Sequence, residues 1–185
     1  DFATADITNE AVAGADYTAV IKNGVTAFKF GAAHPLTQTV TIDINNDTWV
    51  EPSEDLRGTL SNLQPAGQAV TLDGGQATLS ADATIEDNDT AYISIDNVAL
   101  NEDEGPAEFT LTLTGNIQDE LSVDFTTTDG TAIDDDDSDY VYQSGTITFP
   151  ASAVSNTKDT ITIVITDDNI SEPLTEQFTV NLSNI

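Results

Sequence analysis

The sequence contains no cysteine and one histidine, and only four lysine or arginine residues stand against 33 aspartates and glutamates. Without cysteine, the 185-residue chain has no disulfide, no thiolate metal site and no cysteine nucleophile. No run of 18 apolar residues occurs, so the sequence predicts no membrane-spanning helix, and no signal peptide is visible at Asp1. Because the chain starts in what looks like a strand, we expect it to be a piece of a longer protein.

The acidic excess gives the chain a net charge of −29. Such a charge repels phosphate backbones and anionic lipid, so we expect no nucleic-acid partner and no direct membrane insertion. It favours cations and suits salty or calcium-rich water outside the cell. A solvated surface of the kind found in salt-adapted proteins is the alternative explanation, and it needs no bound ion.

Short runs in which polar and apolar residues alternate recur along the chain, and they are rich in threonine, valine and isoleucine. A period of two with these residues is typical of half-buried strands. The runs cover residues 39–44, 93–95, 109–113, 161–165 and 178–182. Turn-forming pairs such as Asn23-Gly24 and Asp129-Gly130 lie between runs, and no stretch of a dozen residues has helical spacing. The pattern predicts an all-β fold of sandwich type.

An internal repeat organises the chain, because six blocks recur in the same order at offsets of 121 to 123 residues. Asp16-Tyr17, for example, matches Asp139-Tyr140. The match predicts repeat one at residues 1–89 and repeat two at residues 90–185. Repeat one would begin at about its third strand and so lack the opening strands. Repeat two would end before a counterpart of the closing strand in 67–85.

Each repeat carries a set of acidic residues at turns next to its strands. In repeat one these are Asp16, Asp47, Glu51, Glu54, Asp87 and Asp89, and in repeat two Glu102, Asp139, Asp168, Glu172 and Glu176. If the fold gathers either set, two carboxylates about 4 Å apart repel by roughly 1 kcal/mol in water and about 4 kcal/mol at an effective dielectric near 20. Oxygen ligands in this number suit calcium, whereas zinc or copper would need histidine or cysteine. The alternative is that the acids are solvated turn residues, as aspartate often is.

Several of these segments carry a resemblance to a known family. The segments are 125–132, Asp139-Tyr140, 145–149, 167–178, 182–184 and the acidic ending 85–89, and they resemble the Calx-beta motif. The resemblance covers nearly the whole chain as two partial copies. It implies tandem immunoglobulin-like antiparallel β-sandwiches that bind calcium at one end. It also places the metal-binding acids of the family on the eleven residues named above, and we expect the repeat-one site to be the more complete.

Enzyme and calcium-loop motifs both fit this sequence poorly. The one histidine, His34, stands alone beside Pro35 in a predicted turn, so a serine nucleophile would have no base. The segment 134–145 has Asp139 where a calcium-binding helix–loop–helix needs glycine and Gly145 where it needs glutamate. We therefore expect a non-enzymatic, calcium-binding repeat of an extracellular or cell-surface adhesive or scaffold protein, stiffened by calcium. Its expected partners are calcium, neighbouring repeats of the same or adjoining chains, and a protein or glycan ligand. The alternatives are a calcium sensor attached to a membrane protein, which the resemblance implies, and a strand-donating subunit of an extracellular filament.

Overall fold

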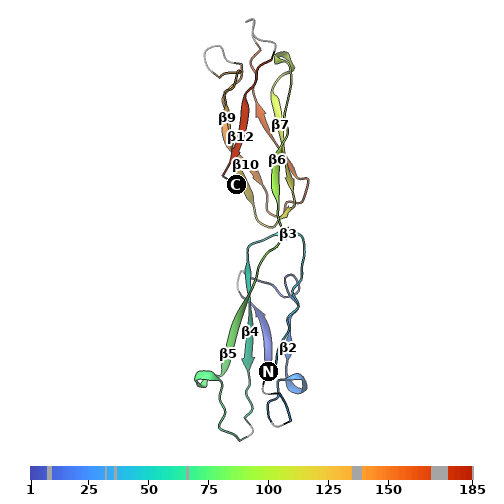
Figure 1. The fold of residues 1–185 in the computed structure, drawn as a ribbon, viewed down its shortest axis with the longest axis vertical. Helices are drawn as coiled ribbons and strands as arrows, with labels where there is room; N and C mark the ends of the chain where they lie inside the picture. Colours follow the sequence, from blue (N-terminus) through green and yellow to red (C-terminus); the bar gives the residue numbers. More distant parts are fainter. Residues whose placement is uncertain are drawn as a thin grey trace. The chain divides into compact units, whose positions relative to one another are not determined.

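The structure is a computed structural model that describes residues 1–7, 10–31, 33–35, 37–65, 67–134, 139–167 and 175–184. These residues form two compact units (Figure 1). Unit 1 comprises Asp1–Asp47 and Pro52–Asp87, and unit 2 comprises Thr48–Glu51 and Asn88–Ile185.

Antiparallel strands dominate both units, so the predicted all-β class is confirmed. The helical segments of the described chain are three short 3₁₀ turns: η1 (Gly24–Thr26), η2 (Asp73–Gly75) and η3 (Glu102–Glu104). No helix in this part of the chain is long and apolar enough to cross a membrane.

Unit 2 is a sandwich of two antiparallel three-stranded sheets. The first sheet has the order β10 (Ser144–Phe149), β9 (Leu121–Thr128), β12 (Thr179–Ser183). The second has the order β11 (Lys158–Ile163), β7 (Ala107–Thr114), β6 (Tyr92–Ile95). A short parallel pair joins β3 (Trp49–Val50) to β8 (Asn116–Ile117).

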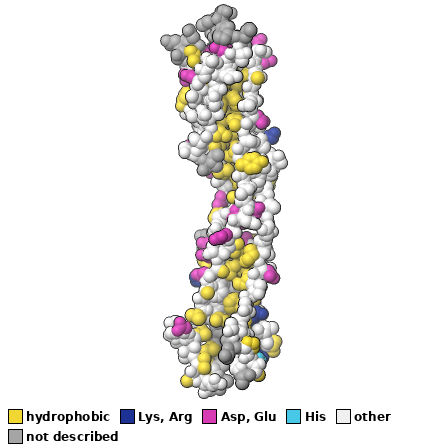
Figure 2. Space-filling model, viewed as in Figure 1, with side chains coloured by type: hydrophobic (Ala, Val, Ile, Leu, Met, Phe, Trp, Pro, Cys, Tyr) yellow, Lys and Arg dark blue, Asp and Glu magenta, His cyan; other side chains and the backbone are white. Residues whose placement is uncertain are grey.

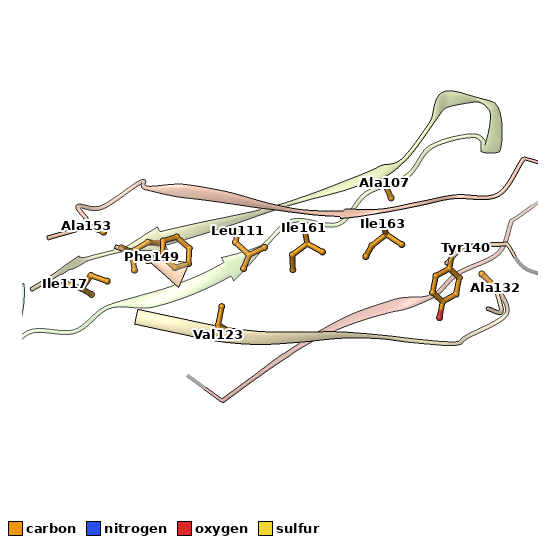
Figure 3. Packing of buried hydrophobic residues seen from close by; sticks show 11 residues of the cluster. Ala107, Leu111, Ile117, Val123, Ala132, Tyr140, Phe149, Ala153, Ile161 and Ile163 are labelled. Atoms are coloured by element: carbon orange, nitrogen blue, oxygen red, sulfur yellow. The ribbon is translucent and has the colours of Figure 1, made fainter. Parts of the chain in front are cut away.

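The core of unit 2 lies between these sheets, as Figure 3 shows. Leu111 on β7 and Ile161 and Ile163 on β11 face Val123 on β9 and Phe149 on β10, and each is at most 2% exposed. Alternate residues of β7 and β11 are the buried ones, which is the period of two read from the sequence.

Unit 1 contains one sheet of the same kind. Its order is β2 (Ile21–Lys22), β1 (Phe2–Asp6), β4 (Glu54–Ser61), β5 (Thr78–Ile85). By the repeat offset, β2, β1 and β4 correspond to β10, β9 and β12, and β5 adds an edge strand beside β4. The core is smaller than in unit 2, because its buried apolar cluster consists of Ala11, Tyr17 and Leu56. Figure 2 shows hydrophobic side chains at the surface of this unit.

The prediction of a strand at 39–44 is wrong. Within this segment only Ile44 pairs, through an isolated antiparallel bridge to Tyr17. The counterpart of this segment in unit 2 is β11, which forms a ladder with β7. The described residues of unit 1 include no counterpart of β7. A strand needs a hydrogen-bonded neighbour as well as an alternating sequence, and this segment lacks the neighbour.

Candidate functional site

A buried tyrosine fixes one predicted acid of each repeat, namely the aspartate that directly precedes it. Tyr17 and Tyr140 have no exposed surface, and each phenol donates a hydrogen bond to a carboxylate, Asp6 Oδ1 at 2.6 Å and Asp129 Oδ1 at 2.7 Å. Burial, followed by the hydrogen bond to the aspartate, raises the pKa of both phenols to about 12. The residue before each tyrosine is therefore anchored at a defined place on its unit.

That preceding residue is Asp16 in unit 1 and Asp139 in unit 2, and three hydrogen bonds orient it. Val12 N donates to Asp16 Oδ2 at 2.6 Å, Asp16 N donates to Val12 O at 3.0 Å, and Asn45 N donates to Asp16 O at 2.9 Å. The corresponding three bonds, at 2.8, 2.9 and 2.9 Å, hold Asp139. The repeat seen in the sequence is thus a repeat of local geometry around this carboxylate.

Acidic cluster 1, which we define as Glu10, Asp16, Asp47 and Glu54, lies in unit 1. Glu54 begins β4 and is half-buried. Burial raises the pKa of its carboxyl, and the charge of Asp16 and a side-chain hydrogen bond shared with Asp16 raise it further. The charges of Glu10 and Asp47 act in the same direction. The structure therefore places two other predicted residues, Asp16 and Asp47, where their charges act on the carboxyl of Glu54.

Acidic cluster 2, which we define as Glu102, Asp139 and Glu176, is the equivalent group in unit 2. Partial burial raises the pKa of Glu176, and the charges of Asp139 and Glu102 and a side-chain hydrogen bond with Asp139 raise it further. The two other predicted residues of this repeat, Asp168 and Glu172, lie outside the described residues.

The remaining predicted residues take different places. Glu51 belongs to unit 2, where its Oε1 accepts a hydrogen bond from Gln118 Nε2 at 2.8 Å. Asp89 also belongs to unit 2, whereas Asp87 belongs to unit 1. Ile85, the last residue of β5, pairs with Glu54, the first residue of β4, and Asp87 follows two residues after Ile85.

Glu10 is the member of acidic cluster 1 that sequence reasoning missed. Its Oε2 accepts a hydrogen bond from the N–H of Asp55 at 2.9 Å, which attaches the loop after β1 to the start of β4. The available signal was weak: the counterpart loop in repeat two carries the acidic run 134–137. The two loops do not align residue by residue, so the repeat alignment identifies no residue of the second loop as the counterpart of Glu10.

The chemistry of both clusters is that of carboxylate oxygens alone. Arg57 forms an ion pair with Asp82 at 2.7 Å, and neither residue belongs to a cluster. Ionised carboxylates only accept hydrogen bonds, so a proton on Glu54 beside Asp16, or on Glu176 beside Asp139, is favoured, in agreement with the raised pKa of both glutamates. A set of hard oxygen donors fits calcium and does not fit zinc.

The carboxylates nevertheless stand wider apart than a bound ion would hold them. In the part of the chain that the structure describes, no three acidic or histidine side chains converge closely enough to hold a metal ion. Calcium ligands lie about 2.3–2.6 Å from the ion, so side chains of each cluster would have to move inward on binding.

A family model described as "Calx-beta domain" matches residues 1–89 and 85–185. No curated protein matches the chain. A similar solved structure, titled "Crystal structure of CBD12 from CALX1.2", is 20% identical, with a TM-score of 0.43. The match covers 98% of this chain and 65% of that chain.

Proposed function

Because this chain belongs to the Calx-beta domain family, we propose that it is a calcium-binding repeat module of a secreted or cell-surface protein. Calx-beta domains are binding and regulatory modules, and the family is known for calcium-binding regulatory domains. The role that we propose for this chain is adhesive or structural and not enzymatic.

The carboxylate pairs at the two equivalent positions carry the proposal. Glu54 shares a hydrogen bond with Asp16, and Glu176 shares one with Asp139, although ionised carboxylates repel each other. After burial and the paired aspartate, the charges of Glu10 and Asp47 raise the pKa of Glu54 further, and the charge of Glu102 raises the pKa of Glu176. An arrangement repeated in two units is more economically explained by a cation than by chance placement of turn residues.

The residues of acidic cluster 1 would act by connecting segments that are distant in sequence. Glu10 and Asp16 lie on the loop after β1, Asp47 follows the segment 37–44, and Glu54 begins β4. When bound, calcium supplies positive charge that offsets the repulsion among these groups. Glu10, Asp16, Asp47 and Glu54 would then hold three separate segments together instead of forcing them apart.

In unit 2 the equivalent ligands would be Glu102, Asp139 and Glu176, with Asp168 and Glu172 added by the match to the family motif. Asp87, Asp89 and Glu51 stay candidate ligands at the predicted repeat boundary. Stiffening of the chain by calcium is the consequence that we propose. The net charge of −29, suited to calcium-rich water, supports a place outside the cell.

Calcium titration tests the proposal. Calorimetry should show saturable heat, and the melting temperature should rise. At calcium 100-fold above its dissociation constant, the free energy of unfolding should increase by about 2.7 kcal/mol. Because salt also screens repulsion, sodium chloride at equal ionic strength is the control for screening. Magnesium is the control for divalent charge, since it requires near-octahedral geometry and retains its waters.

Two outcomes would reject the proposal. One is no heat and no rise in melting temperature at millimolar calcium. The other is a rise that sodium chloride or magnesium reproduces in full, which would show screening by cations in general.

A further inference from the structure

The backbone N–H that follows the paired glutamate is bound in both units, but by different kinds of side chain. In unit 1 Asp55, the residue after Glu54, donates its N–H to Glu10 Oε2 at 2.9 Å. In unit 2 its counterpart by the repeat offset, Gln177, donates to Thr131 Oγ1, also at 2.9 Å. A carboxylate and a hydroxyl therefore accept the same N–H in the two repeats.

In unit 2 this contact belongs to a short bend, residues 129–132, that holds Gln177 at more than one point. Ala132 N donates to Gln177 O at 3.0 Å, and Gly130 passes so close to the same carbonyl that it leaves no room for a Cβ. The first residue of the bend accepts the hydrogen bond from the Tyr140 phenol. The bend therefore binds two segments that lie far apart in the sequence.

Each member of the Asp139–Glu176 pair is one residue away from a group that this bend holds. Asp139 directly precedes Tyr140, and Glu176 directly precedes the residue whose N–H and carbonyl the bend binds. Tyr140 also stacks on Phe178, with ring centroids 4.2 Å apart, which joins the two segments a second time. The bend 129–132 and this stack together limit how far the two carboxylates can separate.

Unit 1 has the same framework, with a charged side chain at the place of the hydroxyl. Tyr17, which follows Asp16, packs with Leu56 in the buried cluster, as the equivalent tyrosine and phenylalanine stack in unit 2. Leu56 is the second residue after Glu54. Because hydrogen bonds to an ionised acceptor are stronger than those to a neutral one, Glu10 should hold its N–H more firmly than the hydroxyl of unit 2 does.

We propose that Thr131 and Glu10 are positioning residues of the two candidate calcium sites, because each fixes the backbone from which the paired glutamate, Glu176 or Glu54, reaches its aspartate. The inference rests on the proposed calcium binding, since it concerns how the same carboxylates are held before the ion arrives. Partners of this kind orient metal ligands, and their loss typically lowers metal affinity by about 10–100-fold.

The two units allow positioning to be separated from coordination. The Thr131 hydroxyl is neutral, so its removal leaves the charge of acidic cluster 2 unchanged. In unit 1, Asp55 N occupies one oxygen of Glu10. Glutamine in place of Glu10 keeps an acceptor for that N–H while it removes the charge. Thr131 and Glu10 therefore provide two independent tests of the same role.

The first test replaces Thr131 in the intact 185-residue chain. Thr131→Val removes the acceptor with little change of shape at an exposed position, and Thr131→Ser keeps it. Calcium titration is followed by NMR, with the amide of Gln177 reporting on unit 2 and that of Asp55 on unit 1, at a temperature where every variant is folded. We expect Thr131→Val to weaken calcium binding in unit 2 by about tenfold, while Thr131→Ser retains it. Thr148→Val, at an exposed position of β10, is the control for the same exchange of side chains.

The second test replaces Glu10. Glu10→Gln should retain most of the calcium affinity reported by the amide of Asp55, whereas Glu10→Ala should lower it by about tenfold. A residue that only stabilises the fold would lower the melting temperature without changing the calcium affinity of the folded molecules. Melting curves recorded for each variant therefore separate this effect from positioning.

Different results would reject the role of each residue. The role of Thr131 is overturned if Thr131→Val binds calcium as tightly as the unaltered chain, or if Thr131→Ser or Thr148→Val weakens binding equally. The role of Glu10 is overturned if Glu10→Gln loses as much affinity as Glu10→Ala, because Glu10 would then be a ligand. If the unaltered chain itself shows no saturable calcium-dependent shift, the proposed function fails, and this inference fails with it.

Discussion

Replacing Glu54 by glutamine should stabilise the calcium-free protein and weaken its binding of calcium, two effects of opposite sign from one substitution. Glu54 is half-buried, and burial and the charges of Asp16, Glu10 and Asp47 raise its pKa. The Glu54→Gln change removes one charge from this group, and the new amide can still donate a hydrogen bond to Asp16.

The size of the stabilisation follows from Coulomb's law. Two charges about 4 Å apart repel by roughly 1 kcal/mol in water and about 4 kcal/mol at an effective dielectric near 20. Glu54 is partly solvated, so we expect a gain of about 1 kcal/mol, near the lower figure. For a unit of this size, about 1 kcal/mol corresponds to a rise of roughly 4–8 °C in melting temperature.

The pH dependence of this gain has a defined sign. The pKa of Glu54 in the folded state is raised above its ordinary value of 4.5, so in that range the folded state binds more protons than the unfolded state. The stability of the unaltered protein therefore falls as the pH rises above about 4.5 and through the folded-state pKa. Glu54→Gln removes this fall, so its advantage should be present at pH 7 and disappear in acid.

Differential scanning calorimetry in chelator and in calcium, together with calcium titration, would measure both effects. We expect calcium affinity to drop roughly tenfold, because affinity depends on the number of charged ligands. Asp73→Asn is the matched control: it removes the same charge from an exposed residue of unit 1, in η2. The reasoning fails if Glu54→Gln lowers calcium-free stability, leaves calcium affinity unchanged, or behaves like Asp73→Asn.

The remaining predictions concern the framework that holds the acidic clusters. Tyr17→Phe and Tyr140→Phe each lose a hydrogen bond to an exposed aspartate, so each should lower the free energy of unfolding by about 1.5 kcal/mol in denaturant titration; no change would contradict the anchoring role. Because both phenols have pKa values raised from 10.0 to about 12, their contribution is complete below pH 10 and lost as pH rises to about 12, and the double phenylalanine variant should show a smaller alkaline fall in stability. Gly115 and Gly14 both have φ of +95°, but an added Cβ at Gly115 would lie 2.6 Å from Thr90 O while Gly14 has open space, so Gly115→Ala should cost clearly more than the roughly 1–3 kcal/mol of backbone strain expected for Gly14→Ala. Equal melting-temperature losses for the two alanine variants would count against the close approach.

Much of the candidate site could be read before folding was considered. The dipeptides Asp16-Tyr17 and Asp139-Tyr140 recur with the blocks around them, and the structure holds both aspartates through matching hydrogen bonds. The same order of blocks put Glu54 and Glu176 in the predicted acidic sets, without indicating which carboxylates would meet. Short-range sequence determines the position of Asp16 and Asp139, because each tyrosine and the aspartate that accepts its hydrogen bond lie 11 residues apart.

Other features of the site depend on contacts between distant segments. Glu10 joins acidic cluster 1 because it bonds to Asp55 N, 45 residues away, and no local pattern encodes that contact. Glu51 shares the acidic motif of repeat one, yet it lies in unit 2 beside Gln118. Whether an acidic turn residue joins a cluster is decided by the path of the chain through space.

The sequence by itself determined the all-β class, the internal repeat, and the acidic residues beside the blocks that recur in both repeats. Alternation, turn formation and charge are properties of neighbouring residues, so they can be read without the fold. The tertiary structure alone decided which carboxylates meet and which alternating runs become strands. Residues 39–44 and 161–165 have the same alternation, but only the second lies in a ladder, from Ile161 to Ile163, with β7 as partner. A strand is stabilised by hydrogen bonds to a neighbour, and the identity of that neighbour is not a local property of the chain.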